Sequence, residues 1–309
     1  MSHTAFLFLI LAGTNDKMDL SGAHTALVTP FDSDLELDEE GLRQNIRFQI
    51  AEGIDGIVPV GTTGESPTLT PEEHERVIEI SVEEAKGKAK VIAGTGSNNT
   101  KEAVHYTKFA KQAGADAALI ISPYYNKPTQ EGLYQHFKKI AESVDIPIIL
   151  YNVPSRTGRN IEAETTIRLS KVKNIVGIKE ASCDLEQIMK IIRDTDDDFL
   201  VLSGEDSFTY SMMGLGAGGV ISVASNLAPA GVANMVHSHL EGDIDASRRL
   251  HYKYLDLFKV IFVETNPGPV KAAMNMMGMP SGDPRLPLVN PSEASKQKIK
   301  AVLSQLKLV

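Results

Sequence analysis

Short apolar runs alternate with amphipathic, helix-like segments along most of this chain. This alternation is typical of βα units joined in a parallel sheet. Eight such units, repeating about every 30 residues, predict a TIM (β/α)8 barrel of the α/β class. An open doubly wound sheet is the alternative, but it commonly has fewer strands. The expected strands are residues 23–28, 56–60, 90–94, 117–121, 147–151, 175–179, 199–203 and 219–223.

The barrel is expected to occupy residues 18–241, with additional C-terminal helices in residues 242–309 packed on it. The helices expected there are residues 244–263, 270–277 and 292–306. Residues 1–17 contain an apolar run that is far shorter than the roughly 20 residues of a membrane-spanning helix. No basic segment of the kind that begins a secretory signal precedes the run. We therefore expect residues 1–17 to lie outside the fold, as they would if the start codon had been assigned too early.

Composition excludes several functional classes. The chain has 309 residues, a net charge of −9 and a pI near 5.4, which argues against a partner nucleic acid because nucleic-acid binders carry basic patches. No membrane partner is predicted.

Cys183 is the only cysteine, so an internal disulfide is impossible and a reducing cytoplasm is the expected location. We expect Cys183 itself to be a small buried hydrophobic residue.

Lys179 follows the short, mostly β-branched apolar run Ile175–Ile178. This run predicts a strand that is buried on both faces and ends at Lys179. A lysine at the carboxyl end of such a strand can reach into an apolar pocket, where desolvation disfavours the charged ammonium. A neutral amine can attack a ketone and form a Schiff base. Glu180 is expected to point to the opposite side, since strand side chains alternate. The alternative for Lys179 is a side chain that simply reaches solvent.

Active sites of TIM barrels lie at the carboxyl ends of the strands, and polar residues collect at those ends here. Gly61–Ser66 after the second strand frames two threonines with two glycines and can cradle a carboxylate or phosphate. Tyr151 ends the fifth strand, one strand before Lys179. Neighbouring strand ends are about 5 Å apart, so the Tyr151 phenol should reach the lysine and transfer protons. Glu205 and Asp206 after the seventh strand are expected to cap the next helix.

The sequence predicts no metal and no cofactor. The eight histidines show no HExxH or similar spacing. His237 and His239 are two residues apart on a predicted helix and do not share a face. There is no GxGxxG dinucleotide loop and no phosphate-binding GxxxxGK[ST] loop.

With these residues in place, the chain resembles the class I, pyruvate-dependent aldolase superfamily, and within it the dihydrodipicolinate synthase family. The resemblance covers residues 21–309 and rests on several motifs in order and at the family's spacing. These motifs are Gly61–Ser66 (GTTGES), Pro123–Asn126 (PYYN), Gln130–Phe137 (QEGLYQHF), Tyr151–Gly158 (YNVPSRTG), Gly177–Ser182 (GIKEAS), Gly219–Val223 (GVISV) and Asn266–Lys271 (NPGPVK).

The resemblance implies a catalytic set. Lys179 would form the Schiff base with pyruvate, and Tyr151 would exchange protons as the imine and enamine form. Thr62 would link Tyr151 to a second tyrosine, Tyr125, which in the family enters from a neighbouring subunit. The implied assembly is a homotetramer built from two such dimers.

The resemblance also implies a substrate-binding set. Thr63 would hold the carboxylate of pyruvate, and Arg156 would hold the carboxylate of aspartate semialdehyde. A planar guanidinium suits bidentate carboxylate binding, which a lysine does not offer. Gly204 and Ile221 would line the pocket through their backbone. The implied reaction is aldol addition, transimination and ring closure in lysine and diaminopimelate synthesis.

Relatives regulated by lysine bind the inhibitor at positions that match four residues of this chain: His74, Asn98, Glu102 and Tyr124. Two prolines depart from that pattern. Pro67 replaces a small alanine, and Pro71 stands where lysine-sensitive members often carry histidine. A proline ring offers no side-chain donor, so we expect inhibition by lysine to be weak or absent.

Two rival functions are weighed against this one. N-acetylneuraminate lyase and 2-keto-3-deoxy-sugar-acid aldolases share the lysine and tyrosine but need a site for a polyhydroxylated chain, and the sialic acid lyases tend to carry serine in place of Thr62. A catalytically silent barrel used as a sensor or scaffold belongs to a different class. It would have no need of Lys179, Tyr151, Thr62 and Arg156 together.

Overall fold

Eight parallel strands close into a barrel in which each strand pairs with the next along the chain and β8 pairs with β1, which confirms the predicted TIM (β/α)8 barrel. The structure is a computed structural model that describes residues 18–309, so the predicted extension at residues 1–17 lies outside the described residues. The strands are β1 (Gly22–Ala26), β2 (Gly56–Val58), β3 (Lys90–Gly94), β4 (Ala117–Ile121), β5 (Ile148–Asn152), β6 (Ile175–Glu180), β7 (Leu200–Ser203) and β8 (Gly219–Ser222).

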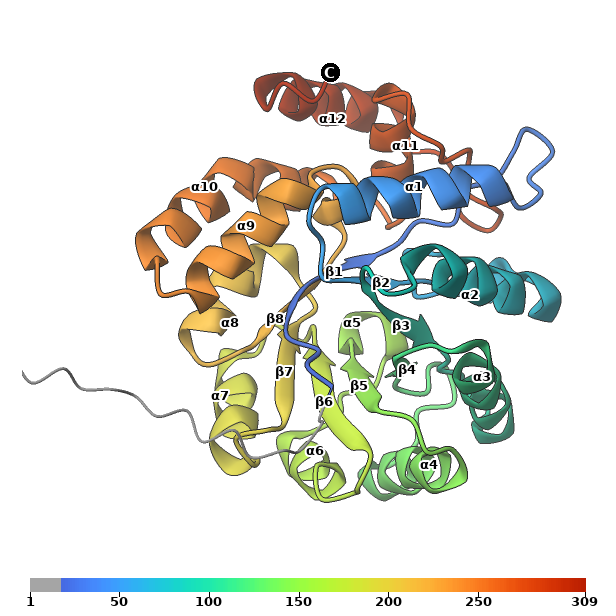
Figure 1. Cartoon of the computed structure of the whole chain (residues 1–309), viewed down its shortest axis with the longest axis vertical. Coiled ribbons are helices and arrows are strands. Elements are labelled where there is room, and N and C mark those ends of the chain that lie inside the picture. Colours follow the sequence, from blue (N-terminus) through green and yellow to red (C-terminus); the bar gives the residue numbers. More distant parts are fainter. Residues whose placement is uncertain (1–17) are drawn as a thin grey trace, which may run out of the picture.

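Helices surround the barrel on its outer side (Figure 1). Those that follow the strands are α1 (Glu39–Ala51), α2 (Pro71–Ala85), α3 (Thr100–Ala113), α4 (Gln130–Ser143), α5 (Pro154–Thr157), α6 (Ala163–Leu169), α7 (Leu185–Asp194), α8 (Thr209–Gly214) and α9 (Pro229–Leu240). Short 3-10 helices lie at Ser66–Thr68 (η1), Asp206–Phe208 (η2) and Ala224–Asn226 (η3). The four-residue helix α5 was not predicted from the sequence.

Local sequence accounts for these elements. β5 has the sequence IILYN, and all five of its residues are buried, as expected for a parallel strand covered on both faces. The start of α2 is fixed by a capping box, in which Thr70 accepts from the Glu73 backbone while the Glu73 side chain accepts from the Thr70 backbone. Pro71 occupies the first helical position, where its missing N–H is no loss.

The barrel closes between β1 and β8 at a pair of glycines. Gly22 is opposite Gly219 in the register, and both have φ in the left-handed region, at 110° and 149°. A Cβ atom on Gly219 would lie 1.9 Å from the Gly22 carbonyl oxygen. Only glycine permits this close approach of the two strands.

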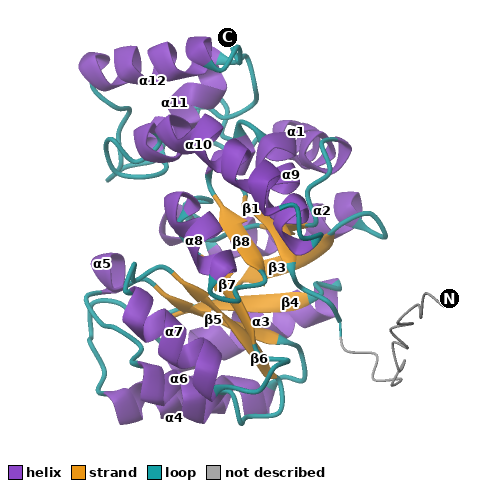
Figure 2. Ribbon diagram, turned by 90° about the vertical axis from the view of Figure 1, so that its left-hand side faces the viewer, coloured by secondary structure: helices purple, strands orange, loops and turns teal. Residues whose placement is uncertain are grey.

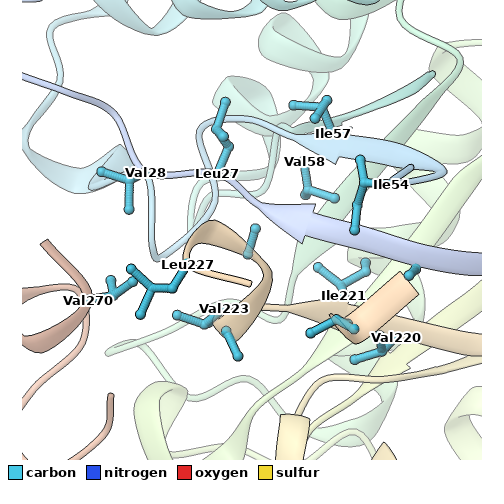
Figure 3. Packing of buried hydrophobic residues seen from close by; sticks show 14 of the residues in the cluster. Leu27, Val28, Ile54, Ile57, Val58, Val220, Ile221, Val223, Leu227 and Val270 are labelled. Atoms are coloured by element: carbon cyan, nitrogen blue, oxygen red, sulfur yellow. The ribbon is translucent and has the colours of Figure 1, made fainter. Parts of the chain in front are cut away.

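Three C-terminal helices follow the barrel: α10 (Ile244–Val260), α11 (Gly268–Met276) and α12 (Glu293–Gln305). Figure 2 shows α11 and α12 together at one end of the molecule, beyond α10. Val270 of α11 belongs to the same hydrophobic cluster as Leu227 and Val28 near the strand ends (Figure 3). The C-terminal helices are therefore joined to the barrel through its apolar core.

Candidate active site

A cavity of about 270 Å³ lies at the carboxyl ends of the strands. A second cavity of about 220 Å³ adjoins it and shares several of its lining residues. The shared residues are Gly61, Thr62, Leu119, Tyr151 and Arg156. The structure thus brings together residues from strand ends that are far apart in the sequence, at the end of the barrel where TIM barrels place their sites.

Lys179 is buried in the larger cavity, with 5% of its surface exposed. In the register of β5 and β6 it stands directly opposite Tyr151. Its Nζ atom lies over the Tyr151 ring, 4.3 Å from the ring centroid. The alternative in which Lys179 reaches bulk solvent is therefore wrong, and the predicted proximity of the amine and the phenol-bearing residue is confirmed.

Glu180, the next residue, faces away from the cavity as predicted and is buried in a polar network. Its carboxylate accepts from Asn152 Nδ2 (3.0 and 3.1 Å), Ser182 N (2.8 Å) and Gln187 Nε2 (3.1 Å). Burial raises the pKa of Glu180, while these hydrogen bonds act in the opposite direction. Because Asn152 follows Tyr151 and Glu180 follows Lys179, the network ties the two strand ends together.

Glu205 lines the cavity that holds Lys179, and Asp206 lies buried behind it. The prediction that these two residues cap the next helix is wrong, since neither η2 nor α8 has a side-chain cap. Asp206 accepts from Ser222 Oγ and from the backbone N–H groups of Val223 and Ala224 (3.0 and 3.1 Å). Burial raises the pKa of both carboxyls, and the charge of Asp206 raises that of Glu205 further.

The loop Gly61–Ser66 brings Thr62 and Thr63 to the cavity wall. Thr63 Oγ1 accepts a hydrogen bond from Asn266 Nδ2 at 3.0 Å. Two residues flanking the threonines have positive φ, Val60 at 49° and Glu65 at 56°. This conformation is strained for a β-branched valine, so packing and hydrogen bonds must hold the loop in place.

Arg156 lies on α5 and lines both cavities. One of its guanidinium nitrogens, Nη2, donates to the backbone oxygen of Asn266 at 3.3 Å. Arg156 is exposed at the cavity. Arg156 and Thr63 are both contacted by Asn266, through its backbone oxygen and its side-chain amide respectively.

Gly204 and Ile221 were both predicted to line the pocket. Gly204 does so, and a Cβ atom there would lie 3.1 Å from Lys179 Cε and 2.6 Å from Ala181 Cβ, so no side chain fits. Ile221 is buried in the barrel wall opposite His24. The cavity at this strand is lined instead by Val223, two residues further on.

Tyr125 is the one predicted catalytic residue that the structure does not bring to the cavity. Its side chain is 89% exposed, and its φ of 69° is in the left-handed region. The neighbouring Tyr124 lines the smaller cavity instead.

Of the four residues predicted for a lysine site, Tyr124 lines the smaller cavity and His74, Asn98 and Glu102 do not. His74 stacks on Tyr106 with ring centroids 4.2 Å apart, and its Nε2 donates to the Gly94 oxygen at 3.0 Å. Burial lowers the pKa of His74 to about 4. Asn98 Nδ2 donates to the Tyr124 oxygen at 3.2 Å, and Glu102 accepts from Ser97 Oγ. Of the four residues, these contacts join Asn98 and Tyr124 directly.

Asn266 and Cys183 line the cavity but were not predicted from the sequence to do so. Asn266 follows the eighth strand by more than 40 residues, so no strand-end argument selects it; its only signal is its place in the NPGPVK motif. Cys183 was predicted to be buried, but it is exposed at the cavity with a φ of 60°. The turn after β6 points its side chain outward, although burial still raises the pKa of its thiol.

Within residues 18–309, no group of three or more histidine, cysteine or acidic side chains is arranged to hold a metal ion. None of the described helices is both long and apolar enough to cross a bilayer. Fold and cavity together define a (β/α)8-barrel enzyme with a buried lysine at the carboxyl ends of its strands.

Comparisons with known proteins identify the family. The model of the dihydrodipicolinate synthetase family matches residues 19–306. The 4-hydroxy-tetrahydrodipicolinate synthase of Syntrophus aciditrophicus is 55% identical over 93% of this chain and 99% of its own length. The dihydrodipicolinate synthase structure from Aquifex aeolicus is 52% identical, with a TM-score of 0.91 over 93% of this chain and 98% of that one. The chloride-inhibited enzyme of Acinetobacter baumannii, complexed with pyruvate, is 42% identical with a TM-score of 0.92, over 94% of this chain and 100% of that one.

The chain belongs to the dihydrodipicolinate synthetase family. Its activity is that of a lyase of lysine biosynthesis, 4-hydroxy-tetrahydrodipicolinate synthase.

Proposed function

We propose that this chain condenses pyruvate with L-aspartate 4-semialdehyde through a Schiff base on Lys179. The observation that carries the proposal is the buried Lys179 amine over the Tyr151 ring, in one cavity with Thr62, Thr63 and Arg156. The pyruvate held by the Acinetobacter baumannii relative supports pyruvate as the first substrate. No cofactor is required by this chemistry, because the amine of Lys179 itself forms the covalent bond.

The first half of the reaction activates pyruvate. The Lys179 nitrogen attacks the ketone carbon, and the carbonyl oxygen leaves as water to give an imine. Loss of a methyl proton from the imine produces the enamine. Tyr151 accepts and returns these protons, and Thr62 with Tyr125 of a second subunit passes them on. Thr63 holds the pyruvate carboxylate during these steps.

The second half joins the aldehyde and releases the enzyme. The enamine carbon attacks the aldehyde carbon of the semialdehyde, whose carboxylate is bound by Arg156, and the resulting alkoxide takes a proton. The substrate amino group then attacks the imine carbon. The carbon bond to Lys179 breaks, the ring closes and the lysine amine is regenerated. Gly204 leaves room for this exchange beside Lys179 Cε.

Borohydride trapping with pyruvate, followed by peptide mass spectrometry, tests the proposal alongside an assay with aspartate semialdehyde. We expect an adduct on Lys179 and turnover of the semialdehyde, and loss of both in Lys179→Ala. An adduct without turnover would favour N-acetylneuraminate lyase or a 2-keto-3-deoxy-sugar-acid aldolase. No adduct would contradict the Schiff-base mechanism. A silent scaffold would show neither adduct nor turnover.

We also propose that the chain works as a homotetramer, a dimer of dimers, in the cytoplasm. The exposed ring of Tyr125 supports the dimer, because a relay through this residue needs a neighbouring subunit to receive it. The single cysteine agrees with a reducing compartment. Light scattering at assay concentrations tests the assembly, and a monomer with full activity would contradict it.

Regulation by lysine is expected to be weak or absent. Asn98 and Tyr124 are in contact, which supports part of a lysine site, but Pro71 occupies the first position of α2 and offers no donor. An activity assay with added lysine tests this expectation. Strong inhibition at micromolar lysine would contradict it.

A further inference from the structure

A fully buried ion pair joins the loop Gly61–Ser66 to the C-terminal helices. Lys271 Nζ of α11 lies 2.7 Å from Glu65 Oε1, and neither side chain has any exposed surface. The two residues are 206 positions apart in the chain. Neither Lys271 nor Glu65 is among the described residues that line the two cavities. The pair therefore lies behind the site and not within it.

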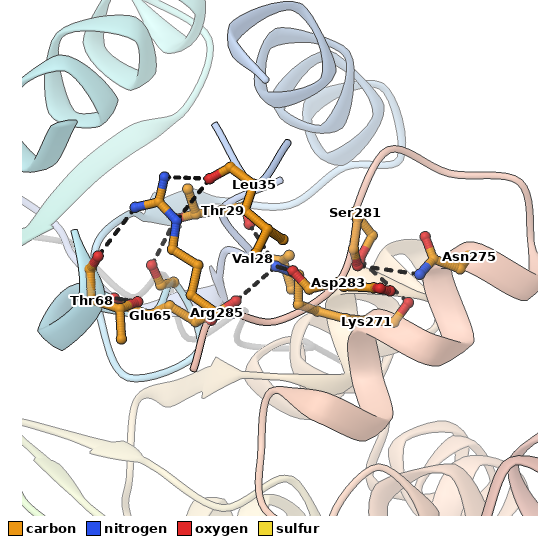
Figure 4. Close-up of polar contacts among 12 residues, drawn as sticks. Val28, Thr29, Leu35, Glu65, Thr68, Lys271, Asn275, Ser281, Asp283 and Arg285 are labelled. Atoms are coloured by element: carbon orange, nitrogen blue, oxygen red, sulfur yellow. Dashed lines mark hydrogen bonds and ion pairs between the residues drawn. The ribbon is translucent and has the colours of Figure 1, made fainter. Parts of the chain in front are cut away.

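Every polar side-chain atom of this pair has a hydrogen-bond partner, and Lys271 Nζ has three (Figure 4). Lys271 Nζ also donates to the backbone oxygens of Thr29 and Asp283, both at 3.2 Å, and lies 4.2 Å from the centroid of the Phe31 ring. The second oxygen of Glu65 accepts from the Arg285 backbone at 2.9 Å. Burial lowers the pKa of Lys271, and the charge of Glu65 opposes that shift.

Stability alone gives little reason to bury such a pair. Replacing both partners of a buried ion pair with apolar residues is often neutral or stabilising, whereas removing one partner is costly. A buried pair can instead fix one conformation among several. Glu65 needs fixing, since its φ of 56° is in the left-handed region that few residues adopt without support.

The conformation of Glu65 sets that of the two threonines before it. Glu65 N donates to the Thr62 oxygen at 3.2 Å, so the turn closes on the threonines. Asn266, five residues before Lys271, donates to Thr63 Oγ1. One segment of the C-terminal region therefore contacts the loop at two points, through a hydrogen bond at Thr63 and an ion pair at Glu65.

We propose that Lys271 and Glu65 are positioning residues that hold Thr62 and Thr63 in the geometry that binds the carboxylate of the 2-oxo acid. The inference rests on the proposed function of Thr63. Arg156 receives the other carboxylate, and its hydrogen bond is with the Asn266 backbone oxygen and not with Glu65 or Lys271. Loss of the pair should therefore weaken pyruvate binding and leave semialdehyde binding largely unchanged.

The test compares the double variant Glu65→Leu/Lys271→Met, which removes both charges, with the isosteric Glu65→Gln. The matched control is Glu84→Gln, which weakens the ion pairs of α2 with Arg43 and Arg47 of α1 and contacts neither Glu65 nor Lys271. For each folded variant, the pyruvate concentration that gives half-maximal borohydride trapping is measured together with kcat and the KM for aspartate semialdehyde.

In the double variant and in Glu65→Gln we expect the half-maximal pyruvate concentration to rise at least about tenfold, since small misplacements of binding groups have effects of this size or more. We expect kcat to fall as well, because Thr62 passes protons to and from Tyr151, whereas the semialdehyde KM should stay within about threefold and the control should match the parent chain. An unchanged pyruvate dependence, or a semialdehyde KM that rises as much as the half-maximal pyruvate concentration, would overturn the proposal. Failure to trap the parent chain on Lys179 would instead overturn the proposed function.

Discussion

At the scale of single residues, Tyr151 meets Lys179 because β5 and β6 pair with these two residues opposite each other. Tyr151→Phe keeps the ring over the amine and removes only the hydroxyl. We expect turnover to fall by about 10²–10⁴-fold, the usual contribution of a general acid–base group, while the folded state is retained. Steady-state kinetics measure the effect, and Tyr210→Phe on α8 serves as the control. Turnover within a few fold of the parent chain would contradict the assigned role.

His74 makes stability depend on pH. Its pKa is lowered by burial to about 4 from an unfolded value of 6.5. Between these values the unfolded chain binds more protons, so stability falls as the pH drops, by about 2 kcal/mol at pH 5. The pKa of His136 is lowered to about 4 by the same cause. These two histidines lie on different helices, α2 and α4, so their effects should add.

Urea unfolding at pH 7 and pH 5 measures this dependence. His74→Phe preserves the stack on Tyr106 but cannot titrate, so the difference between the two pH values should shrink by about 2 kcal/mol. His74→Phe/His136→Phe should shrink it by about twice that amount. A pH dependence equal to that of the parent chain in both variants would show that these histidines are not its source.

At the scale of elements, the eight strands and most helices were predictable because each strand is a short buried apolar run and each long helix has an apolar face. Lys179, Tyr151 and Thr62 could then be predicted to share one site, because a TIM barrel places the carboxyl ends of all its strands together. The four-residue helix α5 was not predicted, because four residues carry no periodicity. Asn266 could not be placed either, since its contact with Thr63 depends on how the C-terminal segment returns over the barrel.

The errors have physical causes. Glu205 and Asp206 stand where helix-capping acidic residues are common, but tertiary contacts override that preference. Asp206 satisfies the backbone at the end of β8, as its hydrogen bonds to Val223 and Ala224 show. Cys183 follows a buried strand, yet a turn with positive φ carries it to the surface. The contacts of Asp206 are with a segment 16 to 18 residues away, which the local capping pattern does not encode.

The polar network of Glu180 is a property of β5 and β6 as a pair. Glu180→Leu removes the acceptor of Ser182 N and one of the acceptors of Asn152 and Gln187, whose amides keep their bonds to Asn160. We expect a loss of about 2–3 kcal/mol in the free energy of unfolding, together with reduced turnover as Lys179 loses its register with Tyr151. Urea unfolding and steady-state kinetics measure these two effects.

Asp184→Ala provides the control for this network. Asp184 is an exposed residue that caps α7 by accepting from Gln187 N at 3.1 Å. Its loss should cost only about 1 kcal/mol and leave turnover unchanged. If Glu180→Leu were no more harmful than this surface cap, the network would have no part in joining the two strands.

At the scale of the whole molecule, a site shared between subunits can be tested by mixing two inactive variants. Lys179→Ala lacks the amine, and Tyr125→Phe lacks the hydroxyl that a neighbour would supply. A mixed dimer of the two has one site with both groups intact and one with neither. We therefore expect mixing under conditions of subunit exchange to restore activity, up to about half of the parent value per mixed dimer.

The control is a mixture of Lys179→Ala with Tyr151→Phe, whose altered residues belong to the same site in one chain. Mixed dimers of this pair have one altered group in each site and should stay inactive. Equal recovery in both mixtures, or recovery in neither, would contradict the sharing of Tyr125.

The separation of Glu65 and Lys271 in the sequence, 206 residues, has a consequence during synthesis of the protein. Glu65 leaves the ribosome more than 200 residues before its cation, so a barrel with all eight strands synthesised still lacks the group that we propose fixes the loop Gly61–Ser66. Under that proposal, we expect a product of interrupted synthesis or of proteolysis before α11 to bind pyruvate poorly. Catalytic competence would then arrive only with the last part of the chain.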